Sequence, residues 1–406
     1  MEGSGAPPGK RLLVLGAGPA QLGLLATARE LGLYVIALDR DPAAPGFRYA
    51  DRRAIISTED EQGIERLAGA EGVEGIIAPG TDWPVAIAAR VAERLRLPHP
   101  LDPEAAALTV SKIRQRERFA EHGLPQPGWQ VVSEAEADVA VPAPCVVKAP
   151  DRQGQRGQTL VQSMDQLPGA IALALAESRS GIAIVEEIVE GPEVQVGGFS
   201  VLGRFFPLTV TDRLTADSPA FGVALTHVWP SEAAGDDVFR VADAVAAAVG
   251  ITDGPTHLEL RIGSGGPQVM ELAGRLGGGH NAELCREVVG VDLNALAISA
   301  ALGEPVEESE LRPEPRVGGA CVRFLVPPEE GVLREVTGVE EARAVEGVRE
   351  LWIYREPGHA FGPFRIGADR AGAVLITGES REQALARADE AASLIRFETV
   401  DAEAVV

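Results

Sequence analysis

The chain has 406 residues, of which 45 % are hydrophobic and 24 % are charged. This length suffices for two or three globular domains, and the normal apolar share excludes disorder across the whole chain. Sixty acidic residues against 37 basic ones give a net charge of −23. That balance argues against a general nucleic-acid binder, which needs a basic face, and suits a protein that acts on small molecules.

The cysteines and the N-terminus indicate a compartment. Cys145, Cys285 and Cys321 show no paired spacing of the metal or redox kind, so a reducing cytoplasm is the simplest setting. No apolar run reaches the roughly 18 residues of a membrane span, so we expect no membrane partner. Residues 1–9 are small and rich in proline and glycine, without the apolar core of a signal peptide, and are predicted to be a loose tail.

Residues 10–108 have the pattern of a doubly wound α/β domain. Its expected elements are strands at 11–15, 34–39 and 75–78, a helix ending near residue 31, and a helix at 83–95. The glycine turn Gly16-x-Gly18-x-x-Gln21 lacks the third glycine of the dinucleotide fingerprint. This turn, and Asp39 at the end of the second strand, fit a nucleotide-binding role and a purely structural role about equally well.

The middle region, 109–306, mixes helices with antiparallel strands. Ser111 is a good N-cap for a helix that ends near His122. The pattern then predicts strands at 145–148, 158–162 and 182–187, a helix at 164–177, antiparallel strands from 193, a long connection at 211–229, a helix at 235–249, a hairpin of 256–262 with 268–273 and a helix at 281–289. Residues 307–406 combine short strands with a helix at 381–395 and form a predicted small α+β domain.

Lysine is rare in this chain, and its positions are informative. There are 34 arginines but only three lysines, Lys10, Lys112 and Lys148. Lys10 borders the N-terminal tail, whereas the other two lie in the middle region. Because arginine fills the ordinary surface cation positions, we infer that Lys112 and Lys148 stand where a compact ammonium group is required.

The hairpin places two carboxylates opposite each other. We interpret Gly263–Pro267 as a five-residue turn that pairs Ile262 with Gln268 and, in the same register, Glu259 with Glu271. Like charges directly opposite destabilise a hairpin unless something neutralises them. A divalent cation does so, and Mg²⁺ commonly takes one or two carboxylates plus phosphate oxygens. The alternative is an acidic pair that faces solvent.

Two glycine-bearing segments near these groups favour oxyanion binding. Arg275 precedes the turn 276–281, where a forked guanidinium and accessible backbone amides suit phosphate or carboxylate. The loop 151–157 follows Lys148 directly, carries two arginines, and resembles a lid that folds over phosphates. The positions singled out are Gly154 and Arg156 in the loop and Gly277 and Gly278 in the turn.

Together these features resemble the ATP-grasp superfamily over the full length of the chain. The resemblance implies an α/β protein with an N-terminal doubly wound domain (10–108), a two-lobed ATP-grasp α+β domain (109–306) and a C-terminal α+β domain (307–406). It also implies ATP and Mg²⁺ as cofactors. Two metal ions are implied, and Mn²⁺ is an alternative to Mg²⁺. The implied ATP contacts are Lys112, Lys148, an adenine hinge with Glu186, Glu187 and the Ile188 backbone, and Glu193 at the ribose, while Glu259 and Glu271 match the metal ligands and Arg275 matches the family's arginine.

Within the superfamily the chain is similar to the L-amino acid ligases, which join amino acids into dipeptides. Three stretches carry this likeness, namely Val210–Thr215, His227–Ser231 and Thr256–Glu259. The resemblance implies that Asp212, His227 or His257 orients the amine substrate or accepts its proton.

The implied reaction is the ATP-dependent ligation of a carboxylate to an amine through an acylphosphate, with release of ADP and phosphate. The implied partners are small carboxylates and amines, chiefly amino acids, and relatives of similar layout suggest a homodimer. Two alternatives stay open: a carboxylase similar to carboxyaminoimidazole ribonucleotide synthetase, and a catalytically silent nucleotide-binding protein. The latter has one argument in its favour, because the family often has a metal-contacting Asn where this chain has Ala273.

Overall fold

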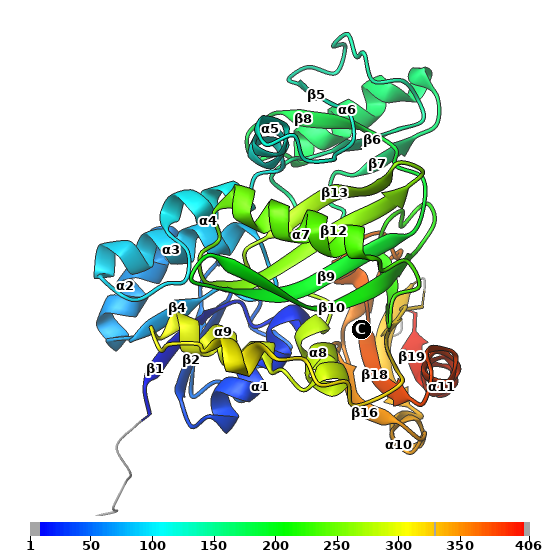
Figure 1. Ribbon diagram of the computed structural model, residues 1–406. Helices are drawn as coiled ribbons and strands as arrows, with labels where there is room; N and C mark the ends of the chain where they lie inside the picture. The colour runs from blue at the N-terminus through cyan, green and yellow to red at the C-terminus, as the bar shows by residue number, and fades with distance from the viewer. Residues whose placement is uncertain (1–8, 329, 402–406) are drawn as a thin grey trace, which may run out of the picture.

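The computed structural model describes residues 9–328 and 330–401 (Figure 1), so nearly all of the predicted tail lies outside the described residues. The expected fold class is confirmed: a parallel α/β sheet, a two-lobed middle region and a C-terminal α+β region. No helix in this part of the chain is both long and apolar enough to cross a bilayer. Short 3-10 helices link several elements, at Pro19–Gln21, Pro45–Tyr49, Met164–Gln166, Glu308–Leu311 and Gly367–Asp369.

The N-terminal sheet has four parallel strands in the order β3-β2-β1-β4. These are β1 (Arg11–Leu15), β2 (Tyr34–Asp39), β3 (Arg52–Ile55) and β4 (Gly75–Ile77), with the helices α1 (Leu22–Glu30), α2 (Glu61–Glu71), α3 (Trp83–Leu95) and α4 (Pro103–Thr109). Side-chain alternation sorts β1 and β2 between two cores, since Leu12 and Val14 join the core of α1 while Leu13 and Leu15 join that of α2 and α3. The sequence did not reveal β3, α2 or α4.

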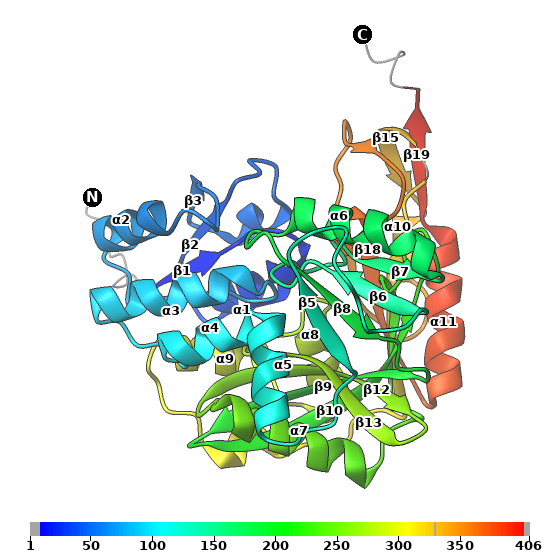
Figure 2. The ribbon, with the colours of Figure 1, turned by 90° about the horizontal axis from the view of Figure 1, so that it is seen from above.

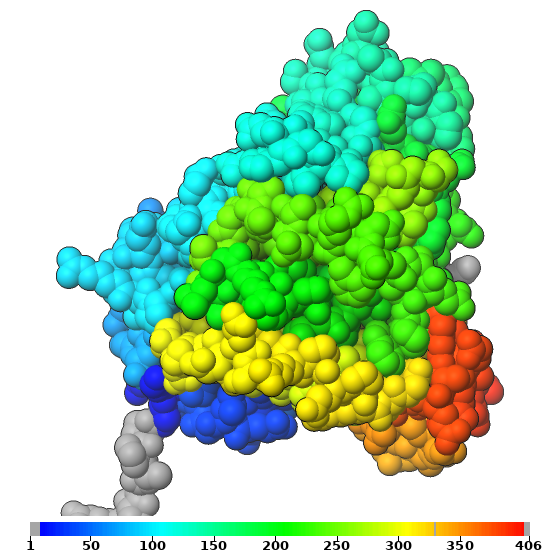
Figure 3. All heavy atoms as spheres, viewed as in Figure 1, coloured from blue at the N-terminus to red at the C-terminus, as the bar shows by residue number. Residues whose placement is uncertain are grey.

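A smaller antiparallel sheet follows in the order β5-β8-β6-β7. Its parts are α5 (Lys112–Glu121), β5 (Trp129–Val132), β6 (Cys145–Lys148), β7 (Thr159–Val161), α6 (Leu167–Glu177) and β8 (Ala183–Glu187). The sheet packs on α6 around its own apolar core. In the space-filling view this lobe projects from the body of the molecule (Figure 3).

The largest sheet has eight strands in the order β13-β12-β9-β10-β11-β14-β18-β16. They are β9 (Glu193–Val201), β10 (Arg204–Thr215), β11 (Ala224–Trp229), β12 (Gly254–Gly263), β13 (Gly266–Ala273), β14 (Gly319–Leu325), β16 (Val348–Ile353) and β18 (Gly372–Gly378). The long connection expected at 211–229 is therefore wrong, because its ends are strands of β10 and β11 that pair with each other.

Helices and a fourth, small sheet, in the order β17-β15-β19, complete the fold. The remaining elements are α7 (Asp236–Val249), α8 (Asn281–Val289), α9 (Leu293–Ala301), α10 (Val339–Arg343), α11 (Arg381–Leu394), β15 (Gly331–Thr337), β17 (Ala360–Phe361) and β19 (Arg396–Val400). One face of the large sheet packs on α7, while α11 packs along β14 and β18 (Figure 2). The expected domain boundaries near 108 and 306 stay predictions, and three strands beyond residue 306, β14, β16 and β18, extend the same sheet as β9–β13.

The hairpin of β12 and β13 differs from the expected one at its turn. Gly263 pairs with Gly266, so the loop has two residues and Ile262 pairs with Pro267 instead of Gln268. A β-bulge between Glu259 and Leu260 then shifts the register by one residue. Glu259 consequently does face Glu271, as predicted, but the bulge and not the turn produces this pairing.

Candidate active site

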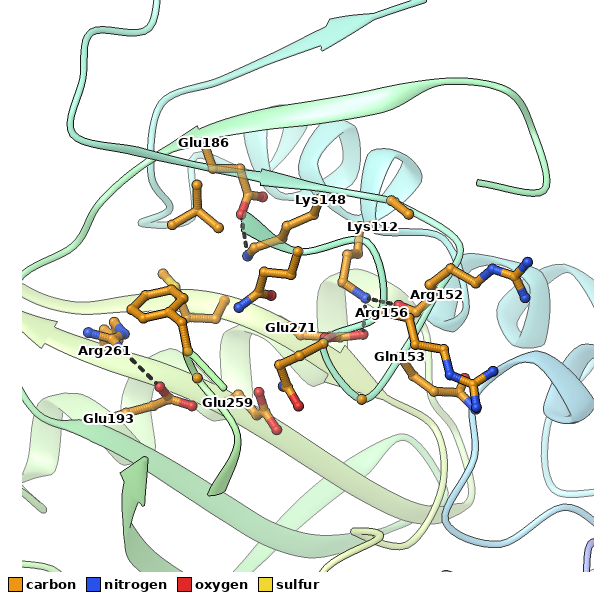
Figure 4. A pocket seen from close by; sticks show the side chains of 18 of the residues that line it. Lys112, Lys148, Arg152, Gln153, Arg156, Glu186, Glu193, Glu259, Arg261 and Glu271 are labelled. Carbon is orange, nitrogen blue, oxygen red and sulfur yellow. Dashed lines mark hydrogen bonds and ion pairs between the residues drawn. The ribbon is translucent and has the colours of Figure 1, made fainter. Parts of the chain in front are cut away.

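A pocket lies between the small sheet and the large sheet, where side chains from distant parts of the chain meet (Figure 4). Its walls include Asp82, Lys112, Lys148, Gly154, Arg156, Glu186, Glu187, Ile188, Glu193, Arg213, Glu259, Glu271 and Arg275. All of the predicted ATP contacts except Gly277 and Gly278, together with both predicted metal ligands, thus lie around one space.

Cross-strand pairing brings the polar groups of the large sheet onto the face that lines the pocket. Arg261 pairs with Glu193 and Arg213 pairs with His227, while Glu193 and Arg213 form a buried ion pair. Because paired residues share a face, these four side chains form one row across β12, β9, β10 and β11. A second row runs beside it through Glu271, Glu259, Gln195 and Thr211.

The paired carboxylates fit a hard divalent cation. Although burial opposes its charge, the cations around Glu259, Arg213 foremost, hold the pKa of this carboxyl well below its usual range, so it is ionised. Glu271 accepts a hydrogen bond of 2.9 Å from Lys112 Nζ, and both carboxylates are partly open to the pocket. In the described part of the chain no three His, Cys, Asp or Glu residues cluster as a metal site. Phosphate oxygens and water would therefore have to complete the coordination.

Lys148 is held by a buried charge network. Glu186 Oε2 accepts a 2.5 Å bond from Lys148 Nζ, and Glu186 Oε1 accepts a 2.7 Å bond from Arg116 Nε. Burial alone would raise the pKa of Glu186, but the charges of Arg116 and Lys148 outweigh it and lower this pKa to about 2. Glu186 was expected at the adenine, yet its carboxylate positions the lysine at the end of β6.

Replacing Lys148 by arginine tests the argument from rare lysines. A broad guanidinium cannot occupy the place of the ammonium between Glu186 and the pocket, so we expect the KM for ATP to rise about 10-fold or more. Lys10→Arg is the matched control, since Lys10 is exposed and pairs with Glu304 on the surface. Steady-state kinetics with varied ATP would measure both. A Lys148→Arg enzyme with the wild-type KM would contradict the inference.

Acid is expected to weaken the lobe interface through Glu186. Its pKa is lower in the folded protein than the usual 4.5, so its contribution to stability is complete above pH about 4.5. That contribution is lost as the pH falls from there toward 2. Urea unfolding at pH 6 and pH 3 should show a smaller acid-induced loss in Glu186→Gln than in the wild type. Equal losses in both proteins would show that Glu186 does not carry this dependence.

The hinge after β8 lies at one end of the pocket. Glu187 accepts from the backbone N–H of Gly128 at 3.0 Å, and its own N–H donates to the Gly128 carbonyl at 2.9 Å. Glu193 accepts from Arg213 through one oxygen and from Arg261 through the other. Both Glu193 oxygens therefore already accept hydrogen bonds. A ribose hydroxyl at Glu193, as predicted, would have to compete with these arginines or share the carboxylate with them.

The predicted lid lies across the pocket and contacts all three regions of the chain. The Arg152 carbonyl accepts from Lys112 Nζ at 3.1 Å, and the side chain of Gln153 accepts from the Asp82 N–H at 3.2 Å. The Gly154 carbonyl accepts from the N–H of Gly367 in the C-terminal region, also at 3.2 Å. A loop tied at these three points can exclude water from the space beneath it.

Arg275 and the glycine turn have separate roles. Arg275 lines the pocket and donates to Asp82 Oδ1 at 2.6 Å, which ties the large sheet to the N-terminal region. A Cβ at Gly277 would lie 2.9 Å from the His257 ring, and one at Gly278 would lie 2.7 Å from the Gly80 carbonyl oxygen. Gly277 and Gly278 are not among the residues that line the pocket, and close packing behind it explains why glycine stands there, so their contact with ATP stays a prediction.

The predicted acid–base residues divide between the two faces of the large sheet. Asp212 points away from Arg213, accepts from Ser231 and the Glu232 N–H, and pairs with Arg381. Its expected role in the reaction is therefore corrected to a structural one. His227 and His257 lie on the pocket side, next to the glycine turn.

The two histidines carry unused hydrogen-bonding atoms. Both ring nitrogens of His227 and Nδ1 of His257 are buried without a hydrogen-bond partner among the described residues. Burial, followed by the nearby Arg213 and Arg370 charges, holds the pKa of His227 well below its usual value, so its ring is neutral. A neutral imidazole with free nitrogens can orient a substrate or accept a proton.

Sequence reasoning missed several residues that shape the site. Arg213, Arg116 and Asp82 are each buried and ion-paired, and one arginine among 34 gives no signal of its own. Asp39, left open as a ribose ligand, accepts from the N–H groups of Ala17 and Asp41 and so fixes the glycine turn.

Comparisons with known proteins agree with this geometry. Residues 141–283 match the family of ATP-grasp domains, and residues 323–400 match the L-amino acid ligase C-terminal domain 2. A formate-dependent phosphoribosylglycinamide formyltransferase of Dechloromonas aromatica is 29 % identical over 410 residues, covering 96 % of this chain and 97 % of that protein.

Two solved structures share the fold at low sequence identity. An L-amino acid ligase from Bacillus licheniformis superposes with a TM-score of 0.82 at 21 % identity, covering 98 % of this chain and 100 % of that one. The N5-carboxyaminoimidazole ribonucleotide synthetase from Thermotoga maritima gives 0.73 at 22 % identity, with 96 % and 100 % covered. Residues 141–283 thus form an ATP-grasp domain, the domain family expected from the sequence, and the chain shares its fold with these two enzymes. Its C-terminal region is similar to that of the L-amino acid ligases.

Proposed function

We propose that this enzyme joins a carboxylate to an amine, giving an amide or dipeptide, through an acylphosphate and with release of ADP and phosphate. The observation that carries the proposal is that both interior lysines, Arg275 and the Glu259–Glu271 pair line one pocket under a lid. The match of residues 323–400 to an L-amino acid ligase domain supports amino acids as the substrate class.

The charges of the pocket suit phosphoryl transfer to a carboxylate. A carboxylate resists amines because its oxygen is a poor leaving group, and conversion to an acylphosphate provides phosphate as a good one. Positioning and charge neutralisation dominate such a step. Lys112, Lys148 and Arg275 supply fixed positive charge, and the lid keeps water from the activated carboxyl group.

Glu259 and Glu271 would hold Mg²⁺, which neutralises phosphate charge when bound. We propose two ions, with Mn²⁺ able to replace Mg²⁺, although Ala273 offers no side-chain ligand between Glu271 and Arg275. We further propose that His227 or His257 orients the amine or takes its proton, because both have free ring nitrogens on the pocket side.

The carboxylase alternative and the silent alternative remain distinct from this proposal. The first would use bicarbonate and an aminoimidazole nucleotide, and the shared fold with the Thermotoga synthetase is its support. The second rests on Ala273 alone. The three free cysteines are buried thiols, which supports our prediction of a cytoplasmic location, and a homodimer remains a proposal by analogy.

Phosphate release from ATP with Mg²⁺ tests the proposal. The panel contains single and paired amino acids, formate with phosphoribosylglycinamide, and bicarbonate with an aminoimidazole ribonucleotide. We expect release that requires amino acids, and a product whose mass is their sum less one water. Release only with a nucleotide substrate would contradict the amino-acid assignment.

A further inference from the structure

Arg370 is a partly buried cation without an acidic partner among the described residues. Its Nε donates to the Ala224 carbonyl at 3.1 Å, and its Cζ lies 3.8 Å from the centroid of the Phe324 ring. No ion pair within residues 9–328 and 330–401 includes it. Loss of water around the guanidinium lowers its pKa to about 10. A partly buried guanidinium with free donors is suited to bind an anion that enters the site.

The other arginines of this region differ from Arg370 in one respect. Arg116 pairs with Glu186, Arg213 and Arg261 pair with Glu193, and Arg275 pairs with Asp82. Arg370 alone among these five keeps its two terminal NH₂ groups free of protein acceptors in the described structure. The chain carries 60 acidic residues, yet none of the described ones is placed to neutralise it. Its free donors can therefore bind an anion that is not part of the protein.

The position of Arg370 links it to the active site. Gly367 donates to the lid at Gly154, and a Cβ at Gly367 would lie 3.8 Å from both Arg370 and the lid residue Gln155. Arg370 is thus beside the lid, at the end of the segment that leads into β18. The charges that act on it include those of Arg213 and Glu259 on the pocket face of the large sheet.

Phe324 connects Arg370 with the unpaired histidine. The Phe324 and His227 rings meet edge to face, with centroids 5.3 Å apart. A Cβ at Gly279 would lie 3.2 Å from Phe324 and 2.7 Å from His227, so a larger residue at this position would clash with these rings. Arg370, Phe324 and His227 therefore follow one another in a row of contacts.

We propose that Arg370 binds a carboxylate that stays unreacted, namely the free carboxylate of the amino acid that serves as the amine substrate. The proposal rests on the proposed ligase function. The carboxylate to be activated must reach phosphate beside Lys112, Arg275 and Glu271, all of which line the ATP pocket, whereas Arg370 does not line it. A guanidinium holds a carboxylate by two parallel N–H···O bonds. The amine nitrogen then forms the new C–N bond, the acyl C–O bond to phosphate breaks, and the amine loses a proton.

The test compares acceptors with and without a carboxylate. Hydroxylamine traps an acylphosphate as a hydroxamate and so reports activation of the first substrate in the wild type. Condensation is then measured with each amino-acid acceptor and with the same amino acid as its primary amide. We expect the wild type to prefer the free acid. In Arg370→Gln the KM for the free acid should rise about 10- to 100-fold relative to the change for the amide, which abolishes the preference.

Two further variants sharpen the result. Arg370→Lys keeps the charge but loses the fork, so it should retain part of the preference, and it carries the test if Arg370→Gln does not fold. Arg396→Gln on β19 is the matched control, because Arg396 is exposed and outside the site, and it should keep the full preference.

The outcomes separate the two proposals. Hydroxamate from the wild type together with an unchanged acid-over-amide preference in both Arg370 variants overturns the role of Arg370 alone. Equal losses for acid and amide overturn it as well, because they indicate a purely structural effect. Absence of hydroxamate from the wild type with every carboxylate overturns the ligase function and this assignment with it.

Discussion

Glu271→Gln is expected to lower ATP turnover about 100- to 1,000-fold. The substitution removes one of the two carboxylates that face each other across β12 and β13, and it also removes the ion pair with Lys112. Both changes act on the transferring phosphate, since the metal and the lysine neutralise its charge. The shape of the side chain hardly changes, so the loss reports charge and coordination and not packing.

Substrate-stimulated phosphate release at increasing Mg²⁺ measures this effect. We expect a lower maximal rate and a higher Mg²⁺ requirement. Glu398→Gln is the control, because Glu398 is an exposed carboxylate on β19, and it should behave as the wild type. Turnover at the wild-type rate in Glu271→Gln would mean that the metal assignment is wrong. Stimulated hydrolysis that is lost in the variant would also exclude the catalytically silent alternative.

Arg116→Met is expected to lower the free energy of unfolding by about 3–5 kcal/mol. Arg116 is 1 % exposed and joins three elements. Its Nε donates to Glu186 on β8 at 2.7 Å, and its two terminal nitrogens donate to the carbonyls of Val269 and Met270 on β13, both at 2.8 Å. Without it, a buried carboxylate keeps only Lys148 as a partner and two carbonyls lose their donors.

Urea unfolding followed by circular dichroism measures the loss. Arg114→Met is the matched control on the same helix, because Arg114 is partly exposed and pairs with Glu104 at the surface. We expect less than about 1 kcal/mol for it. Arg116→Met should also weaken ATP binding, since Glu186 then holds Lys148 less firmly. Equal stability of the two variants would refute the view that Arg116 fastens the small lobe to the large sheet.

The hairpin shows why a correct pairing can rest on an incorrect register. Counting from a five-residue turn places Glu259 opposite Glu271, and the structure has a two-residue turn with a compensating bulge. The sequence pattern of Gly263–Pro267 does not distinguish these turns. On its other edge β12 pairs with β9 without a register shift, which is a contact between residues far apart in the chain.

Residue types with few functional uses were predicted well from the sequence. Lys112 and Lys148 were identified because lysine is otherwise absent from the interior of the chain, and both line the pocket. Arg213 and Arg370 were missed because arginine is abundant, so only burial and partners separate them from the surface arginines. Asp212 was misassigned for a related reason, since one residue along a strand reverses the face on which a side chain lies.

By itself the sequence determined most of the local elements, the alternation of strands and helices in the N-terminal region, and most of the charged groups that line the pocket. These follow from periodicity, turn residues and composition, which act over a few residues. Only the tertiary structure decided that β14, β18 and β16 extend the sheet of the ATP site and bring Arg370 beside the lid. It also decided which arginines are neutralised. Both depend on packing between separate elements of the chain, where apolar burial and charge pairing select one arrangement that no local pattern specifies.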